Sequence, residues 1–314
     1  MTNNLIMIIG VTASGKGKLA ALLAQKLGAE IISVDSMKVY KRMDIGTAKP
    51  PLQIREKLNY HLIDVVEPSD PFNVGKFLEL ADNATTQILA RNKPVVAVGG
   101  TALYIKAMLH GLFNGPGTDD NIRSQLNLAA DTQGLDTLYA HLQKADPQAA
   151  DRIHRNDRKR IIRALEVYKL TGKPISSFQQ QFDTPPSQNW TVIGLRREKE
   201  LENHRINLRV KKMITDGLQQ EVRNLLAEPL PLSPQAACAI GYAEMIRCEN
   251  GDITLENAIE LIKKNSRKLA KAQRTWFKTF RNVHWIDVAE TDTADEVLAK
   301  AEKILTNISF PPSL

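Results

Sequence analysis

A glycine-rich loop near the N-terminus has the residue types and spacing that bind phosphate. The string GVTASGKG at residues 10–17 follows a short apolar run and precedes a helical stretch at residues 18–27. Glycines let successive backbone N–H groups point inward, and a helix N-terminus adds positive potential. Lys16 would reach the terminal phosphate, a role that an unliganded turn would not explain. The residues expected to bind the anion are Gly10, Thr12, Ala13, Ser14, Gly15, Lys16 and Gly17.

The loop departs from the usual phosphate-loop pattern at Gly17. That pattern places Ser or Thr after the lysine so that its hydroxyl binds Mg²⁺, whereas Gly17 has no side chain. The backbone cradle survives, but one metal ligand is missing. We still expect Mg²⁺ as a cofactor, weakly bound through phosphate oxygens, water and a carboxylate such as Asp35, with its protein ligands otherwise unassigned.

Short apolar, β-branched runs alternate with helical stretches, an order typical of a parallel sheet in an α/β fold. The expected strands are residues 5–9, 31–34, 61–66, 95–98, 190–195 and 283–287. Between them, residues 119–186 lose the strand signal and contain helix-period segments such as 158–170. Further helices are expected at residues 198–227 and 255–280. We therefore predict a P-loop NTPase-like core with helices on both sheet faces, formed by residues 1–118 and 187–314, and a helical insertion domain at 119–186.

The composition is that of an ordinary globular protein. Of 314 residues, 43% are hydrophobic and 25% charged, which excludes collagen-like and wholly disordered classes. The two cysteines and six histidines lack metal-ligand spacing, so neither a zinc site nor a disulfide framework is expected. The apolar run at residues 5–9 is far shorter than the roughly 20 residues of a membrane span. We expect a cytoplasmic protein without membrane contact.

A basic stripe is predicted near the C-terminus. The segment 261–284 has eight basic residues and no acid, and most of them recur at steps of three and four, as on one face of a helix. Such a stripe suits an RNA backbone, whereas a merely solvated face usually has interleaved acids. The stripe residues expected to bind RNA are Arg267, Lys271, Arg274 and Lys278. The apolar residues expected to point into the core are Ile262, Leu269, Trp276 and Phe280.

Several strings outside the phosphate loop carry a family resemblance. They are SVDS at 33–36, MDIGTAKP at 43–50, GGTALY at 99–104, RALEV at 163–167 and AIGY at 239–242. Over residues 8–287 the chain closely resembles bacterial tRNA dimethylallyltransferases, also called isopentenylpyrophosphate transferases. MDIGTAKP is highly specific to that family. The resemblance implies transfer of a dimethylallyl group from dimethylallyl diphosphate to N6 of the adenine 3′-adjacent to the anticodon, position 37 of tRNA.

The resemblance also implies residue roles. Adenine N6 is a poor nucleophile because its lone pair is delocalised into the ring, and Asp35 at a strand end is implied as its base, with capping of a turn as the alternative. Thr101 is implied to help the diphosphate leave, and Arg209 to neutralise it, unless Arg209 is a solvated surface charge. The tRNA contacts implied besides the basic stripe are Asp35, Ser36, Met37, Lys38, Thr101, Arg123, Lys159, Arg160, Ile161, Ile162 and Arg163.

Three positions depart from the family pattern and leave an alternative open. Gly17 replaces Thr or Ser, Lys38 stands where many members have Gln, and Ala272 stands where Arg is usual. A tRNA-binding paralogue with weakened or lost catalysis is therefore a second hypothesis. A phosphate-loop kinase is a third, but it explains neither MDIGTAKP nor the basic stripe, and phosphoryl transfer depends more on a metal. The expected partners are the tRNA anticodon stem-loop and dimethylallyl diphosphate, and we expect a monomer.

Overall fold

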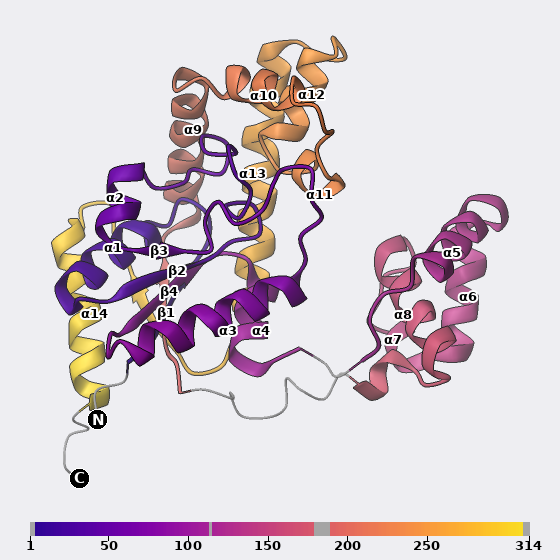
Figure 1. Cartoon of the computed structure of the whole chain (residues 1–314), viewed down its shortest axis with the longest axis horizontal. Coiled ribbons are helices and arrows are strands. Elements are labelled where there is room, and N and C mark those ends of the chain that lie inside the picture. The colour runs from indigo at the N-terminus through magenta and orange to yellow at the C-terminus, as the bar shows by residue number, and fades with distance from the viewer. Residues whose placement is uncertain (1–3, 113–114, 179–188, 310–314) are drawn as a thin grey trace. The chain divides into compact units, whose positions relative to one another are not determined.

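A computed structural model describes residues 4–112, 115–178 and 189–309 of the chain. The chain forms two compact units: unit 1 is Met1–Leu109 with Gln188–Leu314, and unit 2 is His110–Ser187 (Figure 1). The sequence placed the start of the insertion at residue 119. Unit 2 begins earlier, and Arg163 within it donates hydrogen bonds to the carbonyls of Pro116 and Gly117. Residues 179–186 of the expected insertion lie outside the described part.

Unit 1 is built on a six-stranded sheet with the order β3-β2-β4-β1-β5-β6. Its strands, all paired in parallel, are β1 (Leu5–Gly10), β2 (Glu30–Val34), β3 (Tyr60–His61), β4 (Val95–Gly99), β5 (Thr191–Arg196) and β6 (Val283–Asp287). The α/β prediction is confirmed. The strand expected at residues 61–66 is much shorter, because Leu62 and Asp64 have φ values of 61° and 57°, which extended backbone does not adopt.

Helices cover both faces of this sheet because alternate strand residues point to opposite sides. Ile6 and Ile8 of β1 pack into one core, whereas Met7 and Ile9 pack into the other. The first core is closed by α1 (Lys16–Leu27) and α14 (Ala294–Ser309). The second is closed by α3 (Val74–Ala90), α4 (Ala102–His110) and the C-terminal helices. Each face is therefore dry, which explains the continuous apolar runs of the strands.

The C-terminal helices of unit 1 form a layer of their own above the second core (Figure 1). The helical stretch expected at residues 198–227 consists of two helices, because the chain turns at Gly217 with φ 99°. The remaining helices of unit 1 are α2 (Leu52–Lys57), α9 (Lys199–Thr215), α10 (Leu218–Leu226), α11 (Pro234–Ala237), α12 (Tyr242–Glu249) and α13 (Leu255–Phe277). Helix α13 packs along both α9 and α12.

Unit 2 is helical throughout its described residues, with a separate apolar core. Its helices are α5 (Asp120–Gln133), α6 (Leu135–Ala145), α7 (Pro147–Ala150), α8 (Arg158–Thr171) and a 3₁₀ turn at Ile175–Phe178. The Asp157 side chain caps α8, and Gly172 ends it with φ 68°. Ile161 and Ile162 lie in this core, so their side chains cannot contact tRNA as the sequence predicted.

None of the helices in residues 4–112, 115–178 and 189–309 combines the length and the apolar composition that crossing a membrane requires.

Candidate active site

A cavity of about 670 Å³ opens in unit 1 at the carboxyl ends of β1, β2 and β4. Ligands of open parallel sheets usually bind at this edge. Most of the site residues predicted for unit 1 line the cavity. They are Thr12, Ala13, Gly15, Lys16, Gly17, Asp35, Ser36, Met37, Lys38, Thr101 and Arg209. The structure therefore brings the phosphate loop and Asp35 together in one cavity. The three positions that depart from the family pattern, Gly17, Lys38 and Ala272, line the same cavity.

The phosphate loop turns sharply through two left-handed residues, Ala13 with φ 63° and Gly15 with φ 99°. The Lys16 ammonium donates to the Val11 carbonyl at 3.1 Å. Gly10 and Ser14, which were also predicted to bind the anion, are not among the residues that line the cavity. The Ser14 amide donates to Val11, and its buried hydroxyl lies under Gly10, where an added Cβ would come within 2.7 Å of it. Gly10 and Ser14 therefore pack against each other within the phosphate loop.

Gln273 connects the phosphate loop to the loop after β4. Its Oε1 accepts the Thr12 amide at 2.8 Å, and its Nε2 donates to the Gly100 carbonyl at 2.9 Å. The side chain comes from α13 and is 8% exposed. Sequence reasoning missed this residue, since its only signal was a polar residue among the buried positions of that helix. It fixes the spacing between the two loops that line the polar end of the cavity.

Three arginines hold the oxygen atoms of the phosphate loop. Arg205 Nε donates to the Ala13 carbonyl at 2.9 Å, and Arg197 Nε donates to the Ser14 carbonyl at 3.0 Å. Arg209 Nη1 donates to the Thr12 hydroxyl at 3.1 Å. The geometry excludes the solvated-charge alternative for Arg209, because its guanidinium lines the cavity and contacts the loop. Arg197 and Arg205 were not predicted.

The MDIGTAKP segment is a loop held by one carboxylate. Glu221 on α10 accepts the amides of Asp44, Ile45 and Gly46 at 2.9, 2.8 and 3.2 Å. The Tyr242 hydroxyl donates to the same carboxylate at 2.5 Å. A Cβ on Gly46 would lie 2.4 Å from the Tyr242 ring, so this position requires glycine. The MDIGTAKP and AIGY strings are therefore one packed unit that forms part of the cavity wall.

Asp35 has the capping role considered for it, and its role as a base stays a prediction. Its Oδ1 accepts the amides of Met37 and Lys38 at 2.9 and 3.2 Å, which caps the turn after β2. Its Oδ2 has no hydrogen-bond donor among the residues the structure describes, and the side chain lines the cavity. Thr101 Oγ1 accepts the Ser36 amide at 3.2 Å, which leaves its O–H to donate elsewhere. The capping bonds thus orient Asp35 and keep one oxygen for a proton.

The cavity holds more positive than negative charge. Burial, followed by the positive charges of Lys38 and Arg209, lowers the pKa of Lys16 to about 7. The carboxylate of Asp35 opposes these effects. Burial also lowers the pKa of Lys38, again against the attraction of Asp35. An anion bound here would raise both values, because it stabilises the protonated ammonium groups.

Apolar side chains form another part of the cavity wall. Leu269 and Trp276 were predicted to lie in the core, but they are 42% and 37% exposed and line the cavity. They share the cavity-facing side of α13 with the buried Ile262. Phe280 lies beyond the end of the helix and packs edge-on against Phe277. The wall suits a small hydrocarbon group attached to the phosphates.

The basic stripe is partly neutralised. The sequence has no acidic residue within this segment, but acidic and polar partners come from elsewhere in the chain. Arg274 forms an ion pair with the buried Glu202 of α9, and Arg267 donates to Asn207 at 2.7 Å. These partners come from a neighbouring helix and are invisible in the local sequence. Lys271 and Lys278 are exposed. They are the stripe residues left available for an RNA backbone.

The predicted tRNA contacts of unit 2 also divide into paired and exposed residues. Arg123 and Arg163 both bind the fully buried Glu166, at 2.9 and 2.6 Å. Lys159 is exposed at the start of α8, and Arg160 is also exposed but forms an ion pair with Asp157 at 3.2 Å.

The residues of the cavity do not fit a bound Mg²⁺. Gly17 supplies no ligand, and one oxygen of Asp35 already accepts two amides. No group of three or more His, Cys, Asp or Glu in the described part of the chain is placed to hold a metal ion.

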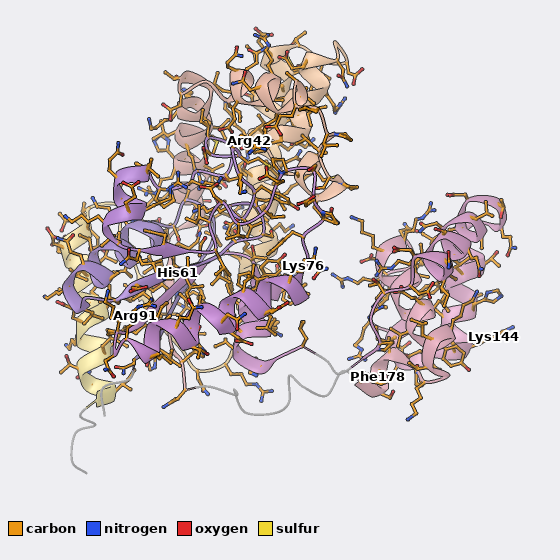
Figure 2. All side chains as sticks on the ribbon, in the orientation of Figure 1. Arg42, His61, Lys76, Arg91, Lys144 and Phe178 are labelled. Atoms are coloured by element: carbon orange, nitrogen blue, oxygen red, sulfur yellow. The ribbon has the colours of Figure 1, made fainter. Side chains whose placement is uncertain are left out.

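A second cavity, of about 630 Å³, lies where β2 begins. Its buried carboxylate, Glu30, bonds to His61, Arg91 and Lys93 at 2.7 to 3.0 Å; the first two are labelled in Figure 2. Burial alone would raise the pKa of Glu30, but these hydrogen bonds lower it to about 2. The buried carboxylate of this cavity already has basic partners, so the cavity is a weaker candidate for a ligand-binding site.

Comparisons with known proteins place the chain in a family. A family model described as IPP transferase matches residues 38–280, and one described as isopentenyl transferase matches residues 3–64. The tRNA dimethylallyltransferase of Geobacter metallireducens is 44% identical over 285 residues, covering 90% of this chain and 92% of the relative. The solved full-length tRNA isopentenylpyrophosphate transferase of Bacillus halodurans is 38% identical, with a TM-score of 0.71 and 98% of both chains covered.

A third match is a eukaryotic dimethylallyltransferase whose structures are described as snapshots of the enzyme acting on tRNA. It is 29% identical, has a TM-score of 0.77, and is matched over 96% of this chain and 79% of its own. The extent of these matches shows that the chain belongs to the IPP transferase family.

Proposed function

We propose that this protein transfers a dimethylallyl group from dimethylallyl diphosphate to N6 of the adenine 3′-adjacent to the anticodon, position 37 of tRNA. The observation that carries the proposal is one cavity that combines a phosphate loop, the carboxylate of Asp35 and an apolar wall. Relatives named tRNA dimethylallyltransferases support the substrate. Because one chain supplies all these groups, we propose a cytoplasmic monomer.

The diphosphate end of the donor would occupy the polar end of the cavity. The amides of the phosphate loop, Lys16 and Arg209 would hold its oxygens, while Leu269 and Trp276 contact the dimethylallyl group. As the bond from the allylic carbon to the bridging oxygen breaks, the bonding electrons go to that oxygen. Donors aimed at such a charge are each worth roughly 10²- to 10³-fold in rate. The Thr101 O–H is a further candidate donor.

The acceptor amine would approach from the side of Asp35. Enzymes that act on a nucleobase take it out of its stack, and anticodon loops offer bases that are already partly unstacked. N6 attacks the allylic carbon to form the new C–N bond, and Oδ2 of Asp35 takes the proton that N6 releases. The amides that hold Oδ1 keep this carboxylate oriented for the transfer.

A tRNA-binding paralogue without catalysis is the main rival. The departures at Gly17, Lys38 and Ala272 favour it, and all three lie in the cavity wall. The intact arrangement of the phosphate loop, Asp35 and Arg209 favours the enzyme. A kinase fits less well, because the cavity offers an apolar wall and a poor set of metal donors.

One assay separates these functions. The full chain is incubated with unmodified tRNA, dimethylallyl diphosphate and Mg²⁺, and the tRNA is digested and analysed by mass spectrometry. A dimethylallyl group on adenine 37 is the expected product. Binding of tRNA without product would support the paralogue, and phosphate transfer from ATP without prenylation would support the kinase.

A further inference from the structure

The cavity lacks a metal ligand at the position where a phosphate loop normally has one. The site of an added Cβ on Gly17 has no atom within 4 Å, so the gap is open space that no other side chain of the described residues fills at close range. A diphosphate bound here would need its charge neutralised by other groups.

Lys38 is placed to supply that charge. Its backbone amide is fixed by Asp35, and its side chain lines the same cavity as Lys16, Arg209 and Gly17. Among the described residues, the Lys38 ammonium has neither a hydrogen bond nor a close ion pair. The residue is only partly exposed and lines the cavity, so an anion bound in the cavity could pair with its ammonium.

The count of charges agrees with this role. Five cationic side chains line the cavity, Lys16, Lys18, Lys38, Arg205 and Arg209, against the one carboxylate of Asp35, which gives a net charge of plus four when every group is ionised. Of these cations, Lys16, Lys38 and Arg209 are only partly exposed, and a glutamine at position 38 would remove one of the three. Charges in a cavity interact more strongly than exposed charges, because water screens them less.

We propose that Lys38 takes over the neutralising role of the metal, so that this protein binds diphosphate without Mg²⁺. The missing hydroxyl at Gly17 and the ammonium of Lys38 then belong together, because the ammonium compensates for the missing metal ligand. The inference rests on the proposed function for the identity of the ligand as an allylic diphosphate. The binding itself is tested separately with inorganic pyrophosphate.

Binding of inorganic pyrophosphate to the full chain is measured by calorimetry, once in Mg²⁺ and once in EDTA. The parent should bind in EDTA with at least the affinity it has in Mg²⁺. Lys38→Gln should weaken binding in EDTA by about 10- to 100-fold, the worth of one charge-assisted hydrogen bond. Lys303→Gln removes the same charge from an exposed position on α14, outside the cavity, and should bind like the parent.

The double variant Gly17→Thr, Lys38→Gln restores the hydroxyl and removes the ammonium. The open space at Gly17 admits the new side chain. This variant should bind weakly in EDTA and regain affinity in Mg²⁺, whereas Lys38→Gln alone should regain little. Circular dichroism of each variant checks that the fold is kept.

Two results would overturn the inference: loss of pyrophosphate binding by the parent in EDTA, or equal binding by the parent and folded Lys38→Gln in EDTA. Prenylation assays in both buffers separate this outcome from the proposed function. Metal-free pyrophosphate binding without prenylation of any tRNA would contradict the proposed function and leave the inference standing. Prenylation and binding that both require Mg²⁺ would do the reverse.

Discussion

The cavity of unit 1 and the helical unit 2 arrange their charges in opposite ways. In unit 2 the buried Glu166 accepts two arginines, Arg123 and Arg163. Other arginines there also have carboxylate partners, in the pairs Arg155–Asp136, Arg158–Asp131 and Arg160–Asp157. In the cavity of unit 1, five lysines and arginines line the wall together with only one carboxylate, Asp35. Paired charges hold a structure together, whereas a buried excess of one sign marks a place for a ligand.

Lys49 shows that burial alone does not make a lysine functional. Its side chain is 1% exposed, yet it binds Asp44 at 2.7 Å and Asp64 at 2.5 Å and donates to the Tyr40 carbonyl. It therefore fixes the MDIGTAKP loop. As whole residues, Lys16 and Lys38 have the same intermediate exposure as Lys49, but neither has such a carboxylate pair in the described residues. The difference lies in their partners and not in their depth.

The largest effect should follow from Asp35→Asn. The change keeps the shape and removes the proton acceptor, so single-turnover prenylation should slow by about 10²- to 10⁴-fold. Binding of tRNA, measured by filter retention, should stay close to that of the parent. An unchanged single-turnover rate would leave Asp35 with only its capping role.

A second large effect is expected at Glu166 in unit 2. Glu166→Gln leaves Arg123 and Arg163 without their shared carboxylate, and breaking a buried pair typically destabilises by about 3–5 kcal/mol. Since the chain has two units, we expect faster amide hydrogen exchange in α5–α8 and little change in β1–β4. Glu290→Gln at an exposed position is the matched control. Equal exchange in both variants would mean that this buried pairing does not stabilise unit 2.

The sheet and the phosphate loop could be predicted because their signals are local. Strands buried on both faces read as apolar runs, and the loop is contiguous in sequence. The supports of the loop were not predictable in this way, since Gln273 lies 261 positions from its partner Thr12. Glu221 likewise lies 175 to 177 positions from the MDIGTAKP amides it accepts. Contacts of this kind depend on how helices pack after folding.

Helical periodicity located the two sides of α13 but not what each side faces. Leu269 and Trp276 were correctly separated from the basic stripe, yet they line a cavity instead of the core. Arg274 was correctly placed on the stripe, yet Glu202 of α9 neutralises it. The spacing of residue types along one helix does not show which other helix packs against it.

The pKa of Lys16 predicts a pH dependence of ligand binding. Its pKa is about 7 in the empty cavity and rises when an anion binds, so the ammonium is present in both states below pH 7. Above pH 7 the free lysine loses its proton, binding must take one up, and affinity should fall by up to about tenfold per pH unit. Calorimetry with pyrophosphate between pH 6.5 and 8.5 measures this.

The matched variant is Lys16→Arg, which keeps the charge but does not titrate in this range. Titration of pyrophosphate itself affects both proteins equally, so the ratio of their affinities isolates the lysine. A ratio independent of pH would show that Lys16 stays protonated throughout.

The smallest effect concerns the exposed and paired members of the basic stripe. Lys271→Gln combined with Lys278→Gln should make the slope of log affinity for tRNA against log salt less steep by about two units or less. Each lysine that no longer contacts a phosphate leaves one counterion on the RNA that binding would otherwise release. Arg274→Gln should leave that slope nearly unchanged and lower the stability instead, because it strands the buried carboxylate of Glu202. The slopes come from filter binding at several salt concentrations, and the stabilities from thermal melting. A contrary result would be that Arg274→Gln lowers the slope as much as the lysine changes do. Arg274 would then have to leave Glu202 and bind the RNA. In that case an ion pair in the free protein would not show that a charged residue is purely structural.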